Sequence, residues 1–167
     1  MPTTQLPTKT LTLTLLTTEQ TLAMVDAMSP EDRAQVSPDW LAALRASDPA
    51  DPWRHGFSIA HRETGHNIGS CCFKGPPADG VVEIAYGIEP EHRGNGYATE
   101  SAQALTNFAF SQNAPTVCAH TLPEPNASTR VLTKCGFTHI GPVIDPEDGL
   151  VWRWEIHREQ PPEPPAT

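Results

Sequence analysis

The chain has 167 residues, 38% of them hydrophobic and 19% charged, which fits one globular domain with a sizeable core. Its formal net charge of −9, from 20 acidic and 11 basic residues, argues against nonspecific nucleic-acid binding and mildly favours a cationic or amine-bearing substrate. No apolar run is long enough to span a membrane and the N-terminus lacks a signal-peptide layout, so we expect a cytoplasmic protein without a membrane partner.

The predicted elements alternate between strands and helices along the chain. Alternating polar and apolar residues, β-branched runs and proline or glycine breaks predict strands over residues 9–16, 53–62, 67–73, 81–88, 115–121, 137–140 and 150–156. Capping residues and helical spacing predict helices over residues 18–28, from 38 onward, around 98–109 and over 126–134. We expect residues 1–8 and the proline-rich residues 159–167 to be disordered, which leaves a domain over 9–158.

The cysteines and histidines give no sign of a metal site. Cys71, Cys72, Cys118 and Cys135 form no Cys-x-x-Cys pair, and neighbouring Cys71 and Cys72 point to opposite faces of a strand. We therefore interpret all four as small buried thiols. The histidines of the 53–73 hairpin are expected to lie at the surface or to make hydrogen bonds.

A glycine loop, His92-Arg93-Gly94-Asn95-Gly96-Tyr97-Ala98, separates the strand over 81–88 from the helix that follows. The N-terminus of that helix presents free backbone N–H groups and a positive dipole, and the glycines let a ligand approach the backbone closely. Arg93 adds a positive charge. We therefore predict a pyrophosphate site here. The spacing fits neither the P-loop nor the Gly-x-Gly-x-x-Gly dinucleotide loop, and an ATP site is the least favoured alternative.

The loop pattern Arg-x-x-Gly-x-Ala, read at Arg93, Gly96 and Ala98, resembles the coenzyme A pyrophosphate loop of the GNAT N-acetyltransferases. A second segment, residues 120–137, resembles the N-x-S-x-x-V-L-x-K-x-G-F segment of one branch of that family, the ribosomal-protein N-terminal acetyltransferases of the RimJ/RimL type. The resemblance is loose over residues 9–156 and specific over residues 81–141.

This resemblance implies an α/β (α+β) GNAT fold with a mixed, mostly antiparallel central sheet flanked by helices. It also implies acetyl-CoA as the cosubstrate, no metal, an amine substrate as the partner, and a monomer or homodimer that binds no nucleic acid. The residues implied to bind the coenzyme are Gly87, Ile88, Glu89, Arg93, Gly94, Asn95, Gly96, Tyr97, Ala98, Thr99 and Asn126.

Glu83 is the candidate general base, because strand alternation places it beside the small Ala85 and Gly87 on one face of the strand over 81–88. Three roles stay open for it: accepting the amine proton directly or through water, only orienting the ammonium, or pairing with a structural group. Glu100 is a second possibility, although a glutamate in a first helical turn more often interacts with the helix dipole.

Ser128 is the candidate contact to the thioester sulfur. Many GNAT enzymes have a tyrosine on this helix as the general acid for the thiolate, but the matching position here is Leu132. A serine hydroxyl can donate a hydrogen bond in its place. The alternative is a first-turn helix serine with no part in the chemistry. Asn126 is a natural N-cap, and the resemblance implies that its side chain faces the coenzyme.

The acceptor amine is the least determined part of the prediction. The branch resemblance favours a protein N-terminal α-amine, which loses its proton more readily than a lysine amine. A small amine such as an amino acid, a polyamine or an aminoglycoside stays open, as does a catalytically quiet acetyl-CoA sensor. The early helices cover the acceptor channel in this fold, yet we expect Trp40 to pack in the core rather than to line that channel. Trp152 and Trp154 are likewise expected in the core.

Overall fold

The computed structural model describes residues 4–48, 51–146 and 148–158. The strands are β1 (Gln5–Pro7), β2 (Leu11–Leu15), β3 (Phe57–His61), β4 (Asn67–Phe73), β5 (Val81–Ile88), β6 (Thr116–Thr121), β7 (Thr138–Asp145) and β8 (Gly149–His157). The helices are α1 (Thr18–Asp26), α2 (Pro30–Ala34), α3 (Pro38–Ala46), the 3₁₀ helix η1 (Pro90–His92), α4 (Tyr97–Ser111) and α5 (Ala127–Lys134).

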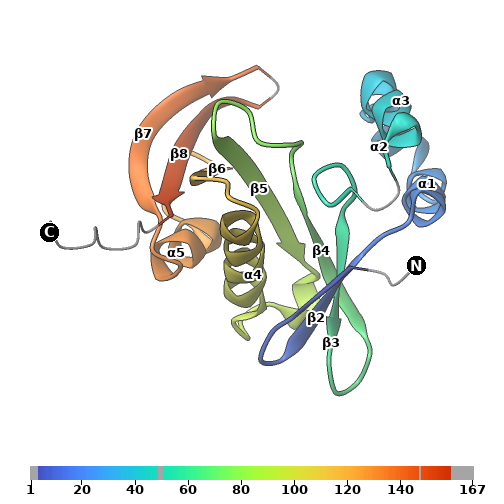
Figure 1. Cartoon of the computed structure of the whole chain (residues 1–167), viewed down its shortest axis with the longest axis horizontal. Helices are drawn as coiled ribbons and strands as arrows, with labels where there is room; N and C mark the ends of the chain where they lie inside the picture. Colours follow the sequence, from blue (N-terminus) through green and yellow to red (C-terminus); the bar gives the residue numbers. More distant parts are fainter. Residues whose placement is uncertain (1–3, 49–50, 147, 159–167) are drawn as a thin grey trace, which may run out of the picture.

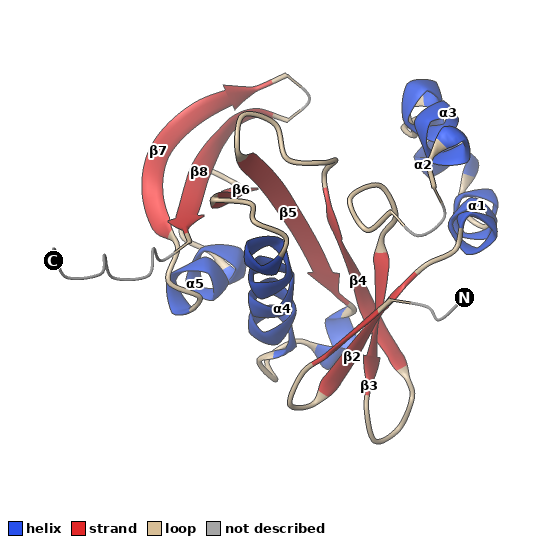
Figure 2. Ribbon diagram, in the orientation of Figure 1, coloured by secondary structure: helices blue, strands red, loops and turns tan. Residues whose placement is uncertain are grey.

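In the part of the chain that the structure describes, these strands form one eight-stranded sheet in the order β1-β2-β3-β4-β5-β6-β8-β7 (Figure 1). β5 and β6 run parallel, whereas the other neighbouring pairs run antiparallel. α4 and α5 lie beside each other on one side of the sheet, and α1, α2 and α3 gather near one end of it (Figure 2). The predicted mixed, mostly antiparallel sheet flanked by helices is confirmed.

The main core lies between the sheet and α4. The helical spacing predicted for α4 is confirmed, because Ala102, Leu105 and Ala109 are fully buried against the apolar face of β5, which includes Val82 and Ile84. β2 alternates buried and half-buried residues as predicted. Within the described residues every helix is too short or too polar to cross a lipid bilayer.

The N-terminal third differs from the prediction in three places, one of which is that β3 begins at Phe57 although we expected a strand from residue 53. Gln5–Pro7, which we expected to be disordered, pairs antiparallel with β2 as an edge strand too short to show an alternating pattern. Ser29-Pro30 ends one helix as predicted but also begins α2, since Ser29 caps it and Pro30 occupies its first turn. Residues 1–3 and the predicted disordered tail, 159–167, lie outside the described residues.

β7 is longer than predicted. We expected a strand over 137–140 followed by a loop, but β7 continues to Asp145. The register shifts between His139 and Gly141, and Gly141 has a φ of 139°. Pro142 is tolerated in the strand because β7 is the last strand of the sheet, where a missing N–H need not break the pairing. The glycine and proline that indicated a loop therefore mark a bulge in an edge strand.

Candidate active site

The N-terminus of α4 is built to receive an anion. Gly94 and Gly96 have φ values of 82° and 81°, in the left-handed region that favours glycine, and Gly96 is the N-cap of α4. Among the residues that the structure describes, no side chain caps α4, whereas Thr17, Ser29 and Asn126 cap α1, α2 and α5. The N–H groups of its first turn are thus left to a ligand or to solvent.

A cavity of about 390 Å³ lies at this helix end, between β5, the glycine loop and α5; we refer to it as the coenzyme cavity. Arg93, Arg130 and Lys134 line it, and no carboxylate does so among the described residues. Within the same part of the chain none of these three cations forms a salt bridge. Arg93 instead donates from Nε to the carbonyl of Ile88 at 3.1 Å, which ties the loop to the end of β5. In a chain with a net charge of −9, this concentration of positive charge indicates an anion site.

β5 and β6 pair over only a short stretch, from Val81 and Thr116 to Glu83 and Cys118. Beyond Glu83, β5 pairs within the described part of the chain only with β4, so no described strand lies beside its edge toward β6 there. Gly87 and Ile88 lie on this part of β5 and line the coenzyme cavity. An extended ligand can therefore run along the backbone of β5 like an added strand.

Two hydroxyl groups meet in the coenzyme cavity. The Oη of Tyr86, on β5, lies 3.0 Å from the Oγ of Ser128, in the first turn of α5, and both residues line the cavity. Burial raises the pKa of Tyr86 to about 12, and the hydrogen bond with Ser128 offsets only part of that effect. Leu132, one turn further along α5, is fully buried and takes part only in packing.

Most of the residues expected to bind the coenzyme line this cavity. They are Gly87, Ile88, Arg93, Gly94, Gly96, Tyr97, Ala98 and Thr99, together with the candidate sulfur contact Ser128.

Glu89, Asn95 and Asn126 were expected at the coenzyme but do not line the cavity. The N–H of Glu89 donates to the carbonyl of Ile68 at 2.8 Å, which continues the pairing of β4 with β5. Asn95 donates to the carbonyls of His92 and Arg93 and so holds the glycine loop. Asn126 caps α5, because its Oδ1 accepts the Thr129 N–H at 2.9 Å. Its capping role is therefore confirmed.

The sequence analysis missed Tyr86, Arg130 and Lys134 as residues of the cavity. Arg130 and Lys134 are four residues apart on α5, so helical spacing puts them on one face and offered a signal. Tyr86 offered no such signal. Its hydroxyl partner lies 42 residues away, and sequence spacing alone does not reveal such a contact.

Glu83 lies on the face of β5 opposite to that of Tyr86, as strand alternation predicts. Its Oε2 is 3.2 Å from Nζ of Lys74 and 3.1 Å from Nδ1 of His120, and about one-fifth of its side chain is exposed. Partial burial lowers the pKa of Lys74, but the neighbouring Glu83 carboxylate raises it more, so Lys74 remains charged. Glu83 is thus held between a cation and an imidazole, close to where β5 and β6 diverge.

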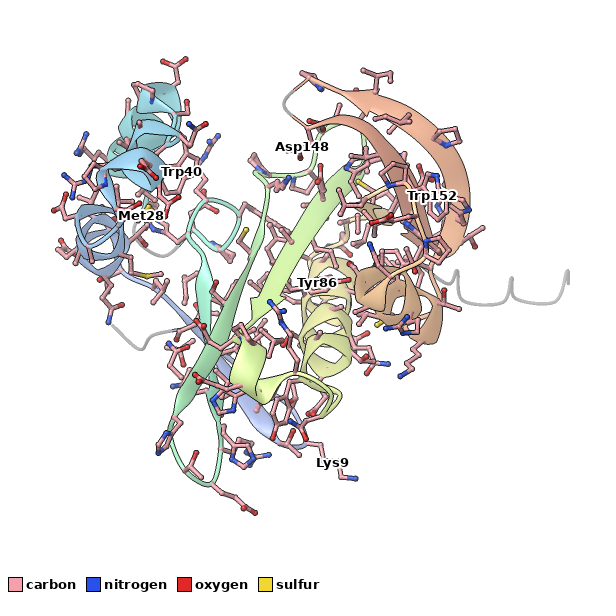
Figure 3. All side chains as sticks on the ribbon, turned by 180° about the vertical axis from the view of Figure 1, so that it is seen from behind. Lys9, Met28, Trp40, Tyr86, Asp148 and Trp152 are labelled. Atoms are coloured by element: carbon pink, nitrogen blue, oxygen red, sulfur yellow. The ribbon has the colours of Figure 1, made fainter. Side chains whose placement is uncertain are left out.

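A second cavity, of about 1010 Å³, adjoins this charged group on the side of α1 and α3; we refer to it as the acceptor cavity. Lys74 lines it next to Cys72, and Trp40 and Asp148 border it from α3 and from the turn between β7 and β8. Figure 3 shows Trp40 and Asp148 on opposite sides of this region. The expectation that Trp40 packs in the core is wrong, because 43% of the residue is exposed.

The remaining candidates have structural roles. Hydrogen bonds from Thr8 and Thr10 lower the pKa of Glu100 against the opposing effect of partial burial, so Glu100 ties α4 to the turn between β1 and β2. Trp154 is buried as predicted and donates from Nε1 to Thr121 at 3.1 Å. Among the described residues there is no group of acidic, histidine or cysteine side chains that could hold a metal ion.

Cys71 and Cys118 are buried as predicted, whereas Cys72 and Cys135 are only partly buried. All four are free thiols. Burial raises the pKa of Cys118 and of Cys135 to about 11, so both keep their protons near neutral pH.

Comparison with protein families gives one match over most of the chain. The family model described as the acetyltransferase (GNAT) domain matches residues 9–138. The uncharacterized N-acetyltransferase p20 of Bacillus licheniformis is 34% identical over 93 residues, which cover 54% of this chain and 52% of that protein. The chain thus spans about half the length of the curated relatives it matches.

Solved structures share the fold over nearly the whole chain. An acetyltransferase from Agrobacterium tumefaciens str. C58 matches with a TM-score of 0.67 and 27% identity over 95% of each chain. The ribosomal L7/L12 α-N-protein acetyltransferase RimL, solved with coenzyme A, matches with a TM-score of 0.66 and 18% identity over 92% of this chain and 98% of that chain. A spermidine N-acetyltransferase SpeG chimera from Vibrio cholerae matches with a TM-score of 0.68 and 20% identity over 89% of this chain and 96% of that one. The last two likenesses concern the fold alone.

Proposed function

We propose, from the premise that the chain belongs to the GNAT acetyltransferase family, that it transfers an acetyl group from acetyl-CoA to the α-amine of a protein or peptide N-terminus. The observation that carries the proposal is the pair of cavities, one beside the uncapped start of α4 and one lined by Lys74, which contacts Glu83. β5 contributes Gly87 and Ile88 to the first cavity and holds Glu83 against Lys74 of the second, so the two substrates would meet along this strand in a ternary complex.

The coenzyme cavity has the features that acetyl-CoA requires. Its pyrophosphate would accept hydrogen bonds from the free N–H groups at the start of α4, with Arg93 nearby. Arg130 and Lys134 add charge at the rim of the cavity, where further phosphate oxygens would lie. The pantetheine arm would then follow the open edge of β5 at Gly87 and Ile88 toward Ser128.

The reaction needs one base and one group that stabilises the leaving sulfur. The neutral amine nitrogen attacks the thioester carbonyl carbon, the C–S bond breaks, and the amine loses a proton. Glu83 is the residue on the acceptor face that would receive this proton, directly or through water, with Lys74 and His120 holding its carboxylate. Ser128, in the coenzyme cavity, would donate a hydrogen bond to the departing thiolate.

The size and lining of the acceptor cavity favour a peptide. It is open, and its walls combine apolar and aromatic side chains with both signs of charge, from Asp39, Asp148, Arg54 and Lys74. A chain terminus presents an amine, a backbone and side chains in sequence, and such a mixed wall can contact all of them.

A small cationic amine is the second candidate. The net charge of −9 favours it, and so do Asp39 and Asp148 at the acceptor cavity. The likeness of the fold to the spermidine acetyltransferase chimera does not choose between these substrates, because it concerns the fold alone.

The test is release of thiol from acetyl-CoA by the purified chain, with free-N-terminus peptides, the same peptides blocked at the N-terminus but carrying lysine, and small amines including polyamines. Turnover confined to free N-termini would support the proposal. Turnover confined to small amines would instead support the second candidate, a small cationic amine as the substrate. If no amine of the panel were turned over but acetyl-CoA still raised the melting temperature, the result would support a coenzyme-binding sensor instead.

A further inference from the structure

We propose that Tyr86 is a positioning residue, which orients the Ser128 hydroxyl so that its single proton points toward the sulfur of the coenzyme. The inference deepens the proposed function and rests on its assignment of Ser128 to the sulfur. It gives Tyr86, which the family resemblance left without a role, a definite part in the reaction.

The geometry begins with two elements that the sequence holds far apart. Tyr86 projects from β5 where β6 no longer pairs with it, and Ser128 occupies the first turn of α5. Their hydroxyl oxygens are 3.0 Å apart, within hydrogen-bond distance. Figure 3 shows Tyr86 in the centre of the molecule, on the α5 side of β5. Both residues line the coenzyme cavity, and the Tyr86 ring also packs against the core.

Either hydroxyl could donate in this pair, and we assign the donor role to Tyr86. Each hydroxyl has one proton to donate, and among the described residues the only hydrogen-bond partner of the Tyr86 hydroxyl is Ser128. When Tyr86 donates to Ser128, the proton of Ser128 remains available for a second acceptor in the cavity. Because burial keeps the phenol protonated at neutral pH, with its pKa raised to about 12, Tyr86 is a donor throughout the working range.

This pairing compensates for the missing tyrosine of α5. Leu132 is fully buried and has no proton to donate, so the sulfur depends on Ser128 alone. As the C–S bond breaks, the electron pair moves to sulfur, and the Ser128 O–H donates a hydrogen bond to it. The Tyr86 donation to the serine oxygen strengthens that bond, as hydrogen bonds in a chain polarise one another. No net proton leaves Tyr86, because the proton lost in the reaction comes from the amine.

The test is the ionisation of the coenzyme A thiol in its complex with the chain, read from thiolate absorbance as the pH is raised, with the coenzyme-free chain subtracted. Burial raises the pKa of all four cysteine thiols, to about 11 for Cys118 and Cys135, so they interfere little. We expect Tyr86→Phe to raise the pKa of the bound thiol by about 0.5 to 1 relative to the wild type. Ser128→Ala should raise it at least as much, and the double variant no further than Ser128→Ala.

Matched variants separate positioning from a loss of structure. Ser128→Thr keeps a hydroxyl, so the pKa of the bound coenzyme A thiol should stay close to the wild-type value. Ser111→Ala removes a helix hydroxyl that donates to the Phe108 carbonyl, away from the coenzyme cavity, and should change nothing. On any amine that is turned over, Tyr86→Phe should lower kcat about three- to tenfold with the KM for acetyl-CoA unchanged.

The inference is overturned if the bound thiol has the same pKa in the Tyr86→Phe variant as in the wild type, whether or not Ser128→Ala shifts that pKa. The titration needs only coenzyme binding, so absence of turnover on every amine would contradict the proposed acetyl transfer and leave this result intact. A Tyr86→Phe variant with a lowered melting temperature and weakened coenzyme binding, but an unshifted thiol, would assign Tyr86 to packing.

Discussion

The two cavities differ in charge and in the elements that form them. Among the described residues the coenzyme cavity is lined by cations without carboxylates, and its walls are a helix start, a central strand and α5. The acceptor cavity has both signs of charge, and α1 and α3, which bury few side chains, form one wall. Under the proposed function, a phosphate-bearing ligand would be recognised by backbone and charge on fixed elements, whereas the acceptor would be recognised by side chains on short helices and turns. Substitutions should therefore affect one substrate at a time.

The largest effect is expected at Glu83, between the two cavities. Glu83→Gln should lower kcat by about 100-fold if the carboxylate takes the amine proton, with the dissociation constant of acetyl-CoA unchanged. Steady-state kinetics and calorimetric titration measure the two quantities. Glu124→Gln, on an exposed turn, is the control. An undiminished kcat would limit Glu83 to pairing with Lys74 and His120.

The next effect concerns the basic rim of the coenzyme cavity. Changing both Arg130 and Lys134 to alanine should weaken acetyl-CoA binding about tenfold, because the phosphates lose two partners. The acceptor KM should stay the same. The double variant of Lys9 and Arg62 to alanine has the same change in net charge away from this cavity. Calorimetry at two salt concentrations measures acetyl-CoA binding. Equally weakened binding in both double variants would mean that the net charge of the protein, and not these two side chains, determines the affinity.

A smaller effect is expected at the mouth of the acceptor cavity. Trp40→Ala should raise the acceptor KM about three- to tenfold, since an exposed aromatic side chain offers a large contact area to the substrate. Acetyl-CoA binding should not change. Met24→Ala removes an equally exposed side chain of α1 that does not line the cavity. A Trp40→Ala variant with weaker coenzyme binding and a normal acceptor KM would reverse the assignment of the cavities.

The smallest functional effect is expected at Asn126. Asn126→Ala removes the cap of α5 and should cost about 1 kcal/mol of stability, a fall of roughly 2–4 °C in Tm. Coenzyme affinity should change less than twofold, because Asn126 does not line the cavity. Thermal melts with and without acetyl-CoA give both values. A tenfold loss of affinity at an unchanged Tm would show that Asn126 faces the coenzyme, as the family resemblance implied.

The sequence predicted the coenzyme side of the molecule better than the acceptor side, for a physical reason. The left-handed Gly94 and Gly96, the helical spacing from Ala102 to Ala109 and the alternation of β5 are all local signals, and each matches the structure. Local backbone requirements restrict residue types within a few positions. Such restrictions can be read directly from a sequence.

Features that depend on contacts between distant segments were not predicted. The exposure of Trp40 depends on how α3 lies against the rest of the chain, and the contact between Tyr86 and Ser128 joins β5 to α5. β7 extends through Gly141 and Pro142 because it lies at the edge of the sheet, a position that the sequence does not reveal. Asn126 was correctly predicted as a cap, but its orientation toward the coenzyme was carried over from the family and the cavity lining does not include it.

The most direct measurement of the central claim is the initial rate of thiol release with acetyl-CoA and an accepted peptide both varied. If both substrates are bound before the amine attacks the thioester, the double-reciprocal plot must show intersecting lines. We predict that pattern, with coenzyme A competing against acetyl-CoA and not against the peptide. Parallel lines would indicate an acetylated enzyme intermediate and would contradict direct transfer between the two cavities.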